Sequence, residues 1–222
     1  MPTMLMPMPI PPRPLAALAP LFVVQFACWT GMFLLWIGAY PVITLAIMPA
    51  APGDPVALRR GLLVLAGCFA WYALLAACLA FLLPRLLSRV SAPVLLGLAA
   101  MVGAGGLASL GWVTSPWALP ASFTALAVGW CALSNLPYTL ASGLVGDVGI
   151  EHAFRVFAFS SILPQLAVTM ALIFVIGEID AATARAIMRA AGLAMATGGV
   201  LALALRHRLA RGITVGMRIE AE

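Results

Sequence analysis

The sequence predicts an all-α integral membrane protein with six transmembrane helices. Of its 222 residues, 64% are hydrophobic and only 9% are charged, and the mean hydropathy is +1.11. A soluble domain of this length has too little interior to bury so large a share of apolar residues. The sequence also contains six apolar runs, each close to or above the roughly 20 residues that cross the hydrocarbon core of a bilayer.

The predicted helices form one transmembrane domain, residues 17–205. Proline and glycine residues interrupt the apolar sequence at the expected connections, for example at Pro52, Gly53 and Pro84. The predicted spans are residues 17–40, 61–83, 93–113, 117–142, 154–176 and 186–205.

Two flanking segments complete the chain: a Pro- and Met-rich segment, residues 1–16, and an Arg-rich tail, residues 206–222. All twelve basic residues are Arg, and they cluster at helix ends instead of forming the stripe that nucleic-acid binding requires. Basic loops resist translocation, and placing both termini in the cytoplasm puts eight Arg residues inside and four outside. We therefore expect both flanking segments to be cytoplasmic and no nucleic-acid partner.

The first predicted helix places Gln25, Trp29, Met32 and Trp36 on one face, because their spacing follows the helical period. An amide inside the hydrocarbon has to find a hydrogen-bond partner or water. Gln25 can bond a neighbouring helix or face a polar pathway, and the sequence favours neither. Trp36, close to the end of the helix, is expected at the outer membrane interface.

The second, third and sixth helices carry little chemistry. The third contains Gly103 to Ala108, and the sixth presents Met188, Gly192, Ala196 and Gly199 on one face. Small residues at this spacing indicate close helix packing. The four cysteines lie inside predicted spans and none is paired at metal-ligand spacing, so we expect no disulfide, no metal site and no cofactor.

The fourth helix combines a polar stripe with a proline. The stripe consists of Thr124, Cys131, Asn135, Tyr138 and Ser142, which recur at helical spacing. Pro137 lacks the N–H that would bond the carbonyl of Leu133, so the helix is expected to bend or open beside Asn135 and Tyr138.

The fifth helix repeats this combination. Ser161, Gln165 and Thr169 lie four residues apart, and Pro164 frees the carbonyl of Ser160. Two successive helices with the same pattern favour residues that line a pathway over purely structural bonds between helices.

Groups for catalysis are missing from the sequence pattern. No Asp, Glu or Lys lies inside a predicted span, so no buried carboxylate is present to carry a coupling proton. No nucleophile with an adjacent base, paired acid and base, or metal cluster is recognisable either. We expect no catalytic residue and no enzymatic activity.

Three parts of the chain resemble the C-terminal six-helix half of a major facilitator superfamily transporter, namely Leu21 to Thr30, Gly129 to Tyr138 and Phe157 to Gln165. The nearest branches are the sucrose/proton symporters and the glycoside-pentoside-hexuronide cation symporters. The resemblance implies a three-plus-three inverted repeat, a site near the membrane midplane and alternating access.

The chain departs from that family in two ways. A complete member has twelve helices, and the loop 83–90 keeps the family's basic character but lacks its glycine and aspartate. Six helices cannot form two rocking halves by themselves. The chain is therefore expected to be a fragment, a homodimer, one half of a split transporter, or a half fold that has left transport.

The resulting expectation is a half-size major facilitator-type transporter in the inner membrane of a bacterium. Together with a second six-helix half, from a homodimer or a separate chain, it would move a small polar solute, with a sugar as the expected class. The expected pathway contacts are Gln25, Trp29, Asn135, Tyr138 and Gln165, and the expected hinges are Pro137 and Pro164. The alternative is a non-transporting membrane scaffold or assembly subunit built on the same half fold.

Overall fold

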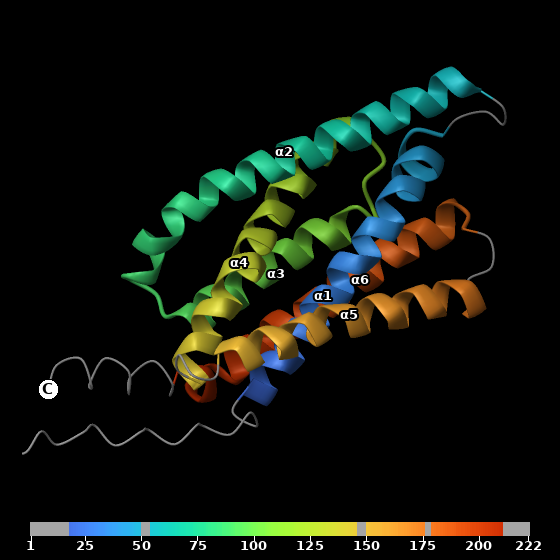
Figure 1. Cartoon of the computed structure of the whole chain (residues 1–222). Coiled ribbons are helices and arrows are strands. Elements are labelled where there is room, and N and C mark those ends of the chain that lie inside the picture. The colour runs from blue at the N-terminus through green and yellow to red at the C-terminus, as the bar shows by residue number, and fades with distance from the viewer. Residues whose placement is uncertain (1–17, 50–53, 146–149, 176–178, 211–222) are drawn as a thin grey trace, which may run out of the picture.

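The computed structural model describes residues 18–49, 54–145, 150–175 and 179–210 (Figure 1). These residues form helices and no strand. The long helices are α1 (Ala19–Pro41), α2 (Pro55–Leu87), α3 (Ala92–Ser109), α4 (Leu119–Val145), α5 (Ile150–Val175) and α6 (Ala181–Ala204). Two short elements extend them: a π-helix, η2 (Val42–Ile47), follows α1, and a 3₁₀-helix, η3 (Pro116–Ala118), precedes α4.

Five stretches of helix are long and apolar enough to cross a membrane, which confirms a multi-pass membrane protein in contact with lipid. They are Ala19–Ile47, Pro55–Leu87, Ala92–Ser109, Pro116–Leu144 and Ala181–Ala204. The fifth predicted span, residues 154–176, is helical as far as Val175, but its apolar stretch within the described residues is the shorter Ala158–Ala171. The predicted segment 1–16 and all but the first residues of the predicted tail lie outside the described residues.

Helix α2 begins six residues before the predicted span because Asp54 caps it. One carboxylate oxygen, Oδ1, accepts hydrogen bonds from the N–H groups of Val56 (2.9 Å) and Ala57 (3.1 Å). Pro55 takes the first helical position, where a missing N–H costs nothing. Asp180 caps α6 in the same way, and hydrogen bonds from Thr183 hold the pKa of its carboxyl below the ordinary value.

The first span is longer than predicted because the chain passes through Pro41 without leaving the helix. Pro41 has no N–H to donate to the carbonyl of Ile37, and the next turn widens into the π-helix η2. The N–H of Met48 then bonds the carbonyl of Ile43 at 2.8 Å, and the hydroxyl of Thr44 donates to the carbonyl of Tyr40 at 2.9 Å.

The helices pack in a symmetric set of pairs. Helix α1 packs most extensively on α6 and then on α5, α4 packs most extensively on α3 and then on α2, and α3 packs on α6. Exchanging α1 with α4, α2 with α5 and α3 with α6 leaves this set of pairs unchanged. Helices α2 and α5 therefore lie at opposite edges, and α1 and α4 lie between them (Figure 1).

Small residues bring the inner helices together, as their spacing predicts. A Cβ atom on Gly192 of α6 would lie 2.8 Å from the backbone nitrogen of Ala108 in α3. A Cβ atom on Gly103 of α3 would lie 2.9 Å from the Cα of Gly129 in α4. At these contacts only glycine allows the two helix backbones to approach so closely.

Arg185 ties three elements together at one end of the bundle. From α6, its Nη1 donates to the carbonyl of Val113, just after α3, and its Nη2 donates to the carbonyl of Ala46 in η2, both at 2.9 Å. These carbonyls lie at helix C-terminal ends, where a cation is favoured. One turn later, the guanidinium of Arg189 lies 5.9 Å from the centre of the Trp112 ring.

Candidate functional site: a polar and aromatic face between two apolar helices

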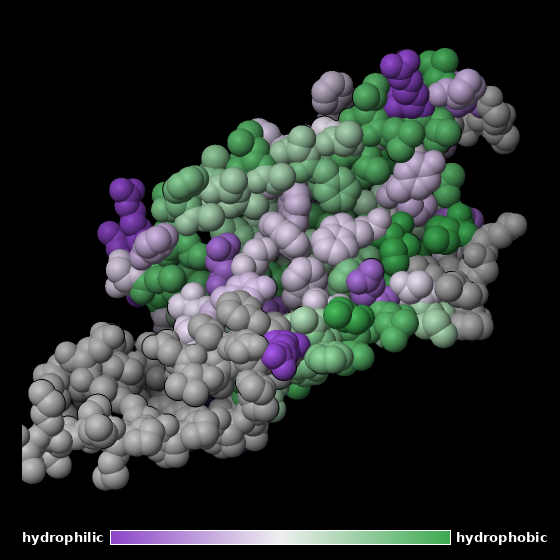
Figure 2. Space-filling model, viewed as in Figure 1, coloured by the Kyte–Doolittle hydropathy of each residue, from purple (hydrophilic) through white to green (hydrophobic). Residues whose placement is uncertain are grey.

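One face of the molecule carries a band of hydrophilic and weakly hydrophilic residues between two hydrophobic ridges (Figure 2). In the same view, the ridges are α2 and α5, and the band runs over the helices between them (Figure 1). We call this band, formed by the outward sides of α1 and α4, the polar face.

The centre of the polar face is an aromatic cluster that joins α1 to α4 and α2. The rings of Trp29 and Trp130 meet edge to face, with their centres 5.6 Å apart and an angle of 83° between the planes. Trp36 lies within 6.1 Å of Trp29 and 6.0 Å of Trp130, and Tyr72 of α2 lies 5.9 Å from Trp130. Trp36 therefore belongs to this cluster, and its position at the outer membrane interface stays a prediction.

Two polar atoms without a partner lie next to this cluster. The Oε1 atom of Gln25 and the Oγ atom of Ser134 are buried and have no hydrogen-bond partner among the described residues. Gln25 precedes Trp29 by one turn, and Ser134 follows Trp130 by one turn. Because α1 and α4 run in opposite directions (Figure 1), both atoms lie on the same side of the Trp29–Trp130 contact.

The hydroxyl of Tyr72 is a third buried polar atom without a partner in the described part of the chain. Its ring lies against Trp130. A buried polar atom left without a hydrogen bond costs about 1–3 kcal/mol. Three such atoms beside one aromatic cluster are unusual in a packed core and are typical of a site that receives water or a polar ligand.

Asn135 and Tyr138 lie on the outward side of α4. Both side chains are exposed, Tyr138 to 44% of its surface. The Asn135 amide donates from Nδ2 to the carbonyl of Cys131 at 2.7 Å, which leaves its Oδ1 atom available as an acceptor. Pro137 is buried, and α4 runs through it from Leu119 to Val145 without an interruption.

Gln165 is exposed on α5, and Pro164 beside it is buried inside the continuous helix. Helix α5 packs mainly on α1, and α4 packs mainly on α3 and α2. Figure 1 shows α4 and α5 meeting near the connection between them and then diverging. The structure thus places Trp29 beside Trp130, and it places Gln25 and Ser134 on the same side of that contact. Gln165 lies apart from these residues, on α5.

Sequence reasoning missed three members of this site, namely Trp130, Ser134 and Tyr72. Trp130 was expected on another side of the fourth helix and Ser134 was not singled out, because the stripe through Asn135 and Tyr138 was richer in polar residues. A signal was present, since Trp130 and Ser134 are four residues apart and lead to Tyr138 at the same spacing. Tyr72, in contrast, belongs to no periodic pattern of polar residues in its helix.

The polar face offers hydrogen bonds and ring surfaces rather than fixed charge. Among the described residues, no group of three or more His, Cys, Asp or Glu side chains could hold a metal ion. The cysteines are free thiols. Neutral acceptors next to indole rings that meet edge to face are the chemistry that suits a polar, uncharged ligand.

No protein-family model matches this sequence, and no curated protein matches it either. The resemblance to the major facilitator superfamily therefore stays a prediction.

Proposed function

We propose that this chain is a half-size transporter of the major facilitator type, which moves a small polar solute such as a sugar across the inner membrane of a bacterium. In this proposal the polar face turns toward a second six-helix half, either another copy or a separate chain. The two halves enclose the solute and expose it alternately to the two sides, and both termini of this chain lie in the cytoplasm.

The observation that carries the proposal is the exposure of polar side chains on α4, which is long and apolar enough to cross the membrane, and within the apolar stretch Ala158–Ala171 of α5. Asn135, Tyr138 and Gln165 are exposed on α4 and α5. Hydrocarbon offers no hydrogen-bond donor to the side-chain oxygen of an exposed amide, so residues such as Asn135 and Gln165 usually face a protein or a water-filled cavity. A second six-helix half that covers α1 and α4 between α2 and α5 provides both a protein surface and an enclosed, water-filled cavity.

The symmetric helix pairs support the same proposal. The exchange of α1 with α4, α2 with α5 and α3 with α6 relates the first three helices to the last three. The Trp29–Trp130 contact obeys the same exchange, because it joins α1 to α4 near the centre of the set. Such a relation is expected of a three-plus-three inverted repeat, in which substrate sites lie at the repeat interface.

The residues of the polar face then have separate tasks. Trp29 and Trp130 present ring surfaces to the apolar side of a sugar ring, and the Gln25 and Ser134 oxygens accept hydrogen bonds from its hydroxyl groups. Asn135, Tyr138 and Gln165 contact the solute as it enters or leaves. Pro137 and Pro164 allow α4 and α5 to bend between the two states.

Uptake of radiolabelled sugars into proteoliposomes tests this function. The full chain should take up at least one sugar, and Asn135→Ala and Gln165→Ala should each reduce that uptake by tenfold or more. Thr197→Ala is the matched control, because Thr197 is exposed on α6 and also bonds the carbonyl four residues earlier, at 2.9 Å. Its uptake should equal that of the wild type.

The scaffold alternative predicts a different result. If folded Asn135→Ala and Gln165→Ala protein transports every solute that the wild type transports, at the same rate, the pathway assignment is wrong. If the wild type transports nothing but a crosslinker captures a different membrane protein at Tyr138→Cys, the chain is a non-transporting subunit.

A further inference from the structure

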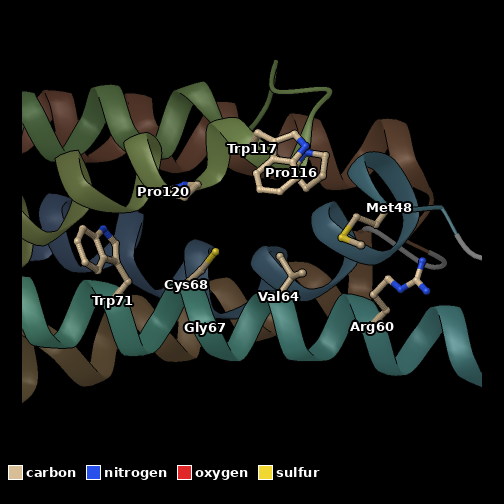
Figure 3. A pocket seen from close by; sticks show the side chains of 9 residues that line it. All are labelled: Met48, Arg60, Val64, Gly67, Cys68, Trp71, Pro116, Trp117 and Pro120. Carbon is tan, nitrogen blue, oxygen red and sulfur yellow. The ribbon is translucent and has the colours of Figure 1, made fainter.

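A cavity of about 380 Å³ lies between α2 and the start of α4. Arg60, Val64, Gly67 and Trp71 line it from α2, and Trp117 and Pro120 line it from η3 and α4 (Figure 3). Its volume falls within the roughly 300–1,000 Å³ that is usual for small-molecule sites.

The cavity is long, apolar and charged at one end. Arg60 and Trp71 lie at opposite ends in Figure 3, and their sequence separation of eleven positions corresponds to about 16 Å of α-helix. The residues between the ends are apolar, and Arg60 is the one charged residue among those that line the cavity in the described part of the chain. Such a site fits an amphipathic molecule with an apolar tail and an anionic head.

The cavity opens at the side of the bundle and at the beginning of α2. Trp117, which forms one wall, is 91% exposed. The indole N–H of Trp71 is held by the hydroxyl of Thr124 at 3.0 Å, which fixes the far wall between α2 and α4. Arg60 lies in the second turn of α2, next to the exposed Arg59, where the helix leaves the apolar region. This is the level at which lipid head groups meet a spanning helix.

We propose that this cavity binds an anionic phospholipid, with an acyl chain along the groove from Val64 to Trp71 and the head-group phosphate at Arg60. Charge complementarity favours the anionic class, because a guanidinium attracts a head group of net negative charge, whereas in phosphatidylcholine the choline cation offsets the charge of the phosphate. Neither Tyr72 nor Trp130 lines this cavity, and lipid binding is measured without solute transport, so the proposal does not depend on the proposed transport function.

Gly67 provides a direct test because a Cβ atom there meets nothing within 4 Å and would project into open space. Gly67→Phe should therefore fill the groove without a clash. Gly105→Phe in α3 is the matched control, since a Cβ atom on Gly105 also meets nothing within 4 Å but this residue does not line the cavity. Native mass spectrometry of the detergent-solubilised full chain, titrated with phosphatidylglycerol, measures the binding.

The wild type and Gly105→Phe should bind one phosphatidylglycerol with the same affinity, and Gly67→Phe should bind it at least tenfold more weakly. Arg60 is exposed, so Arg60→Gln leaves the fold intact. This variant should lose about fivefold in affinity for phosphatidylglycerol and less for phosphatidylcholine, whose choline cation offsets the charge of the phosphate.

The proposal is overturned if Gly67→Phe and Gly105→Phe bind phosphatidylglycerol equally, or if the wild type binds phosphatidylcholine as tightly. Should Gly67→Phe fail to fold, Gly67→Leu and Arg60→Gln decide the question by the same comparison. Sugar uptake plays no part in these outcomes, so a failure here leaves the transport proposal untouched.

Discussion

The α3–α6 side of the molecule and the polar face are built in opposite ways. At α3 and α6, glycine and alanine bring backbones into contact, and where α3 meets α4 the hydroxyls of Ser109 and Ser122 lie 2.8 Å apart, within hydrogen-bond distance. On the polar face, the Gln25 and Ser134 oxygens are buried without a partner, and amides are exposed. The close packing of the α3–α6 side stabilises the fold. The polar face leaves polar groups without partners, which lowers stability but keeps those groups available to bind a ligand.

The largest predicted effect is a loss of stability when the contact between α3 and α6 is disrupted. Gly192→Leu places a Cβ atom 2.6 Å from the Cβ of Ala108 and 2.8 Å from its backbone nitrogen, neither of which can move without shifting α3. We expect the free energy of unfolding to fall by about 1–3 kcal/mol or more. Urea unfolding in mild detergent, followed by tryptophan fluorescence, measures the change, and Gly105→Leu should leave it unaltered.

A second prediction concerns the Arg185 hydrogen bonds, which tie α6 to the end of α3 and to η2. Arg185→Gln removes the hydrogen bonds to the carbonyls of Val113 and Ala46, and we expect a loss of about 1.5–3 kcal/mol. Arg189→Gln removes only the contact with Trp112, which contributes about 0.5–1 kcal/mol. The same unfolding measurement compares the two variants. Equal losses would mean that Arg185 does not tie the three elements together.

The smallest effect on stability is expected on the polar face, and its sign is reversed. Gln25→Met keeps the volume of the side chain, which is 97% buried, and removes an acceptor that has no partner. The free energy of unfolding should rise by about 1 kcal/mol. Gln165→Met, at an exposed position, should change it by less than about 0.5 kcal/mol. A loss of stability in Gln25→Met would show that the amide has a structural partner.

The sequence was sufficient to predict the helices, the small-residue packing and the membrane location. Apolar length and helical periodicity depend only on local sequence, which explains why α3 and α6 agree with their predicted spans to within a few residues. The extension of the first span through Pro41 was missed, because proline usually ends a helix and a π-turn has no sequence signature.

The candidate site was predicted less completely. Periodicity shows which residues share one side of a helix, but it does not show which helix they meet. The sequence therefore singled out Asn135 and Tyr138 without the neighbouring Trp130, whose role depends on Trp29 from α1 and Tyr72 from α2. Contacts between residues so far apart in the chain follow from the packing order of the helices, which no single segment encodes.

The most direct test of the central claim asks whether the polar face meets water or acyl chains. Asn135→Cys and Leu74→Cys, each in a Cys78→Ala background, place one exposed thiol on α4 and one on the outward side of α2. Reaction of the protein in lipid vesicles with a water-soluble maleimide is followed by mass. The account predicts that the thiol at 135 is labelled and the thiol at 74 is not. If the thiol at 135 is as unreactive as the thiol at 74, the polar face is turned to lipid and the account is wrong.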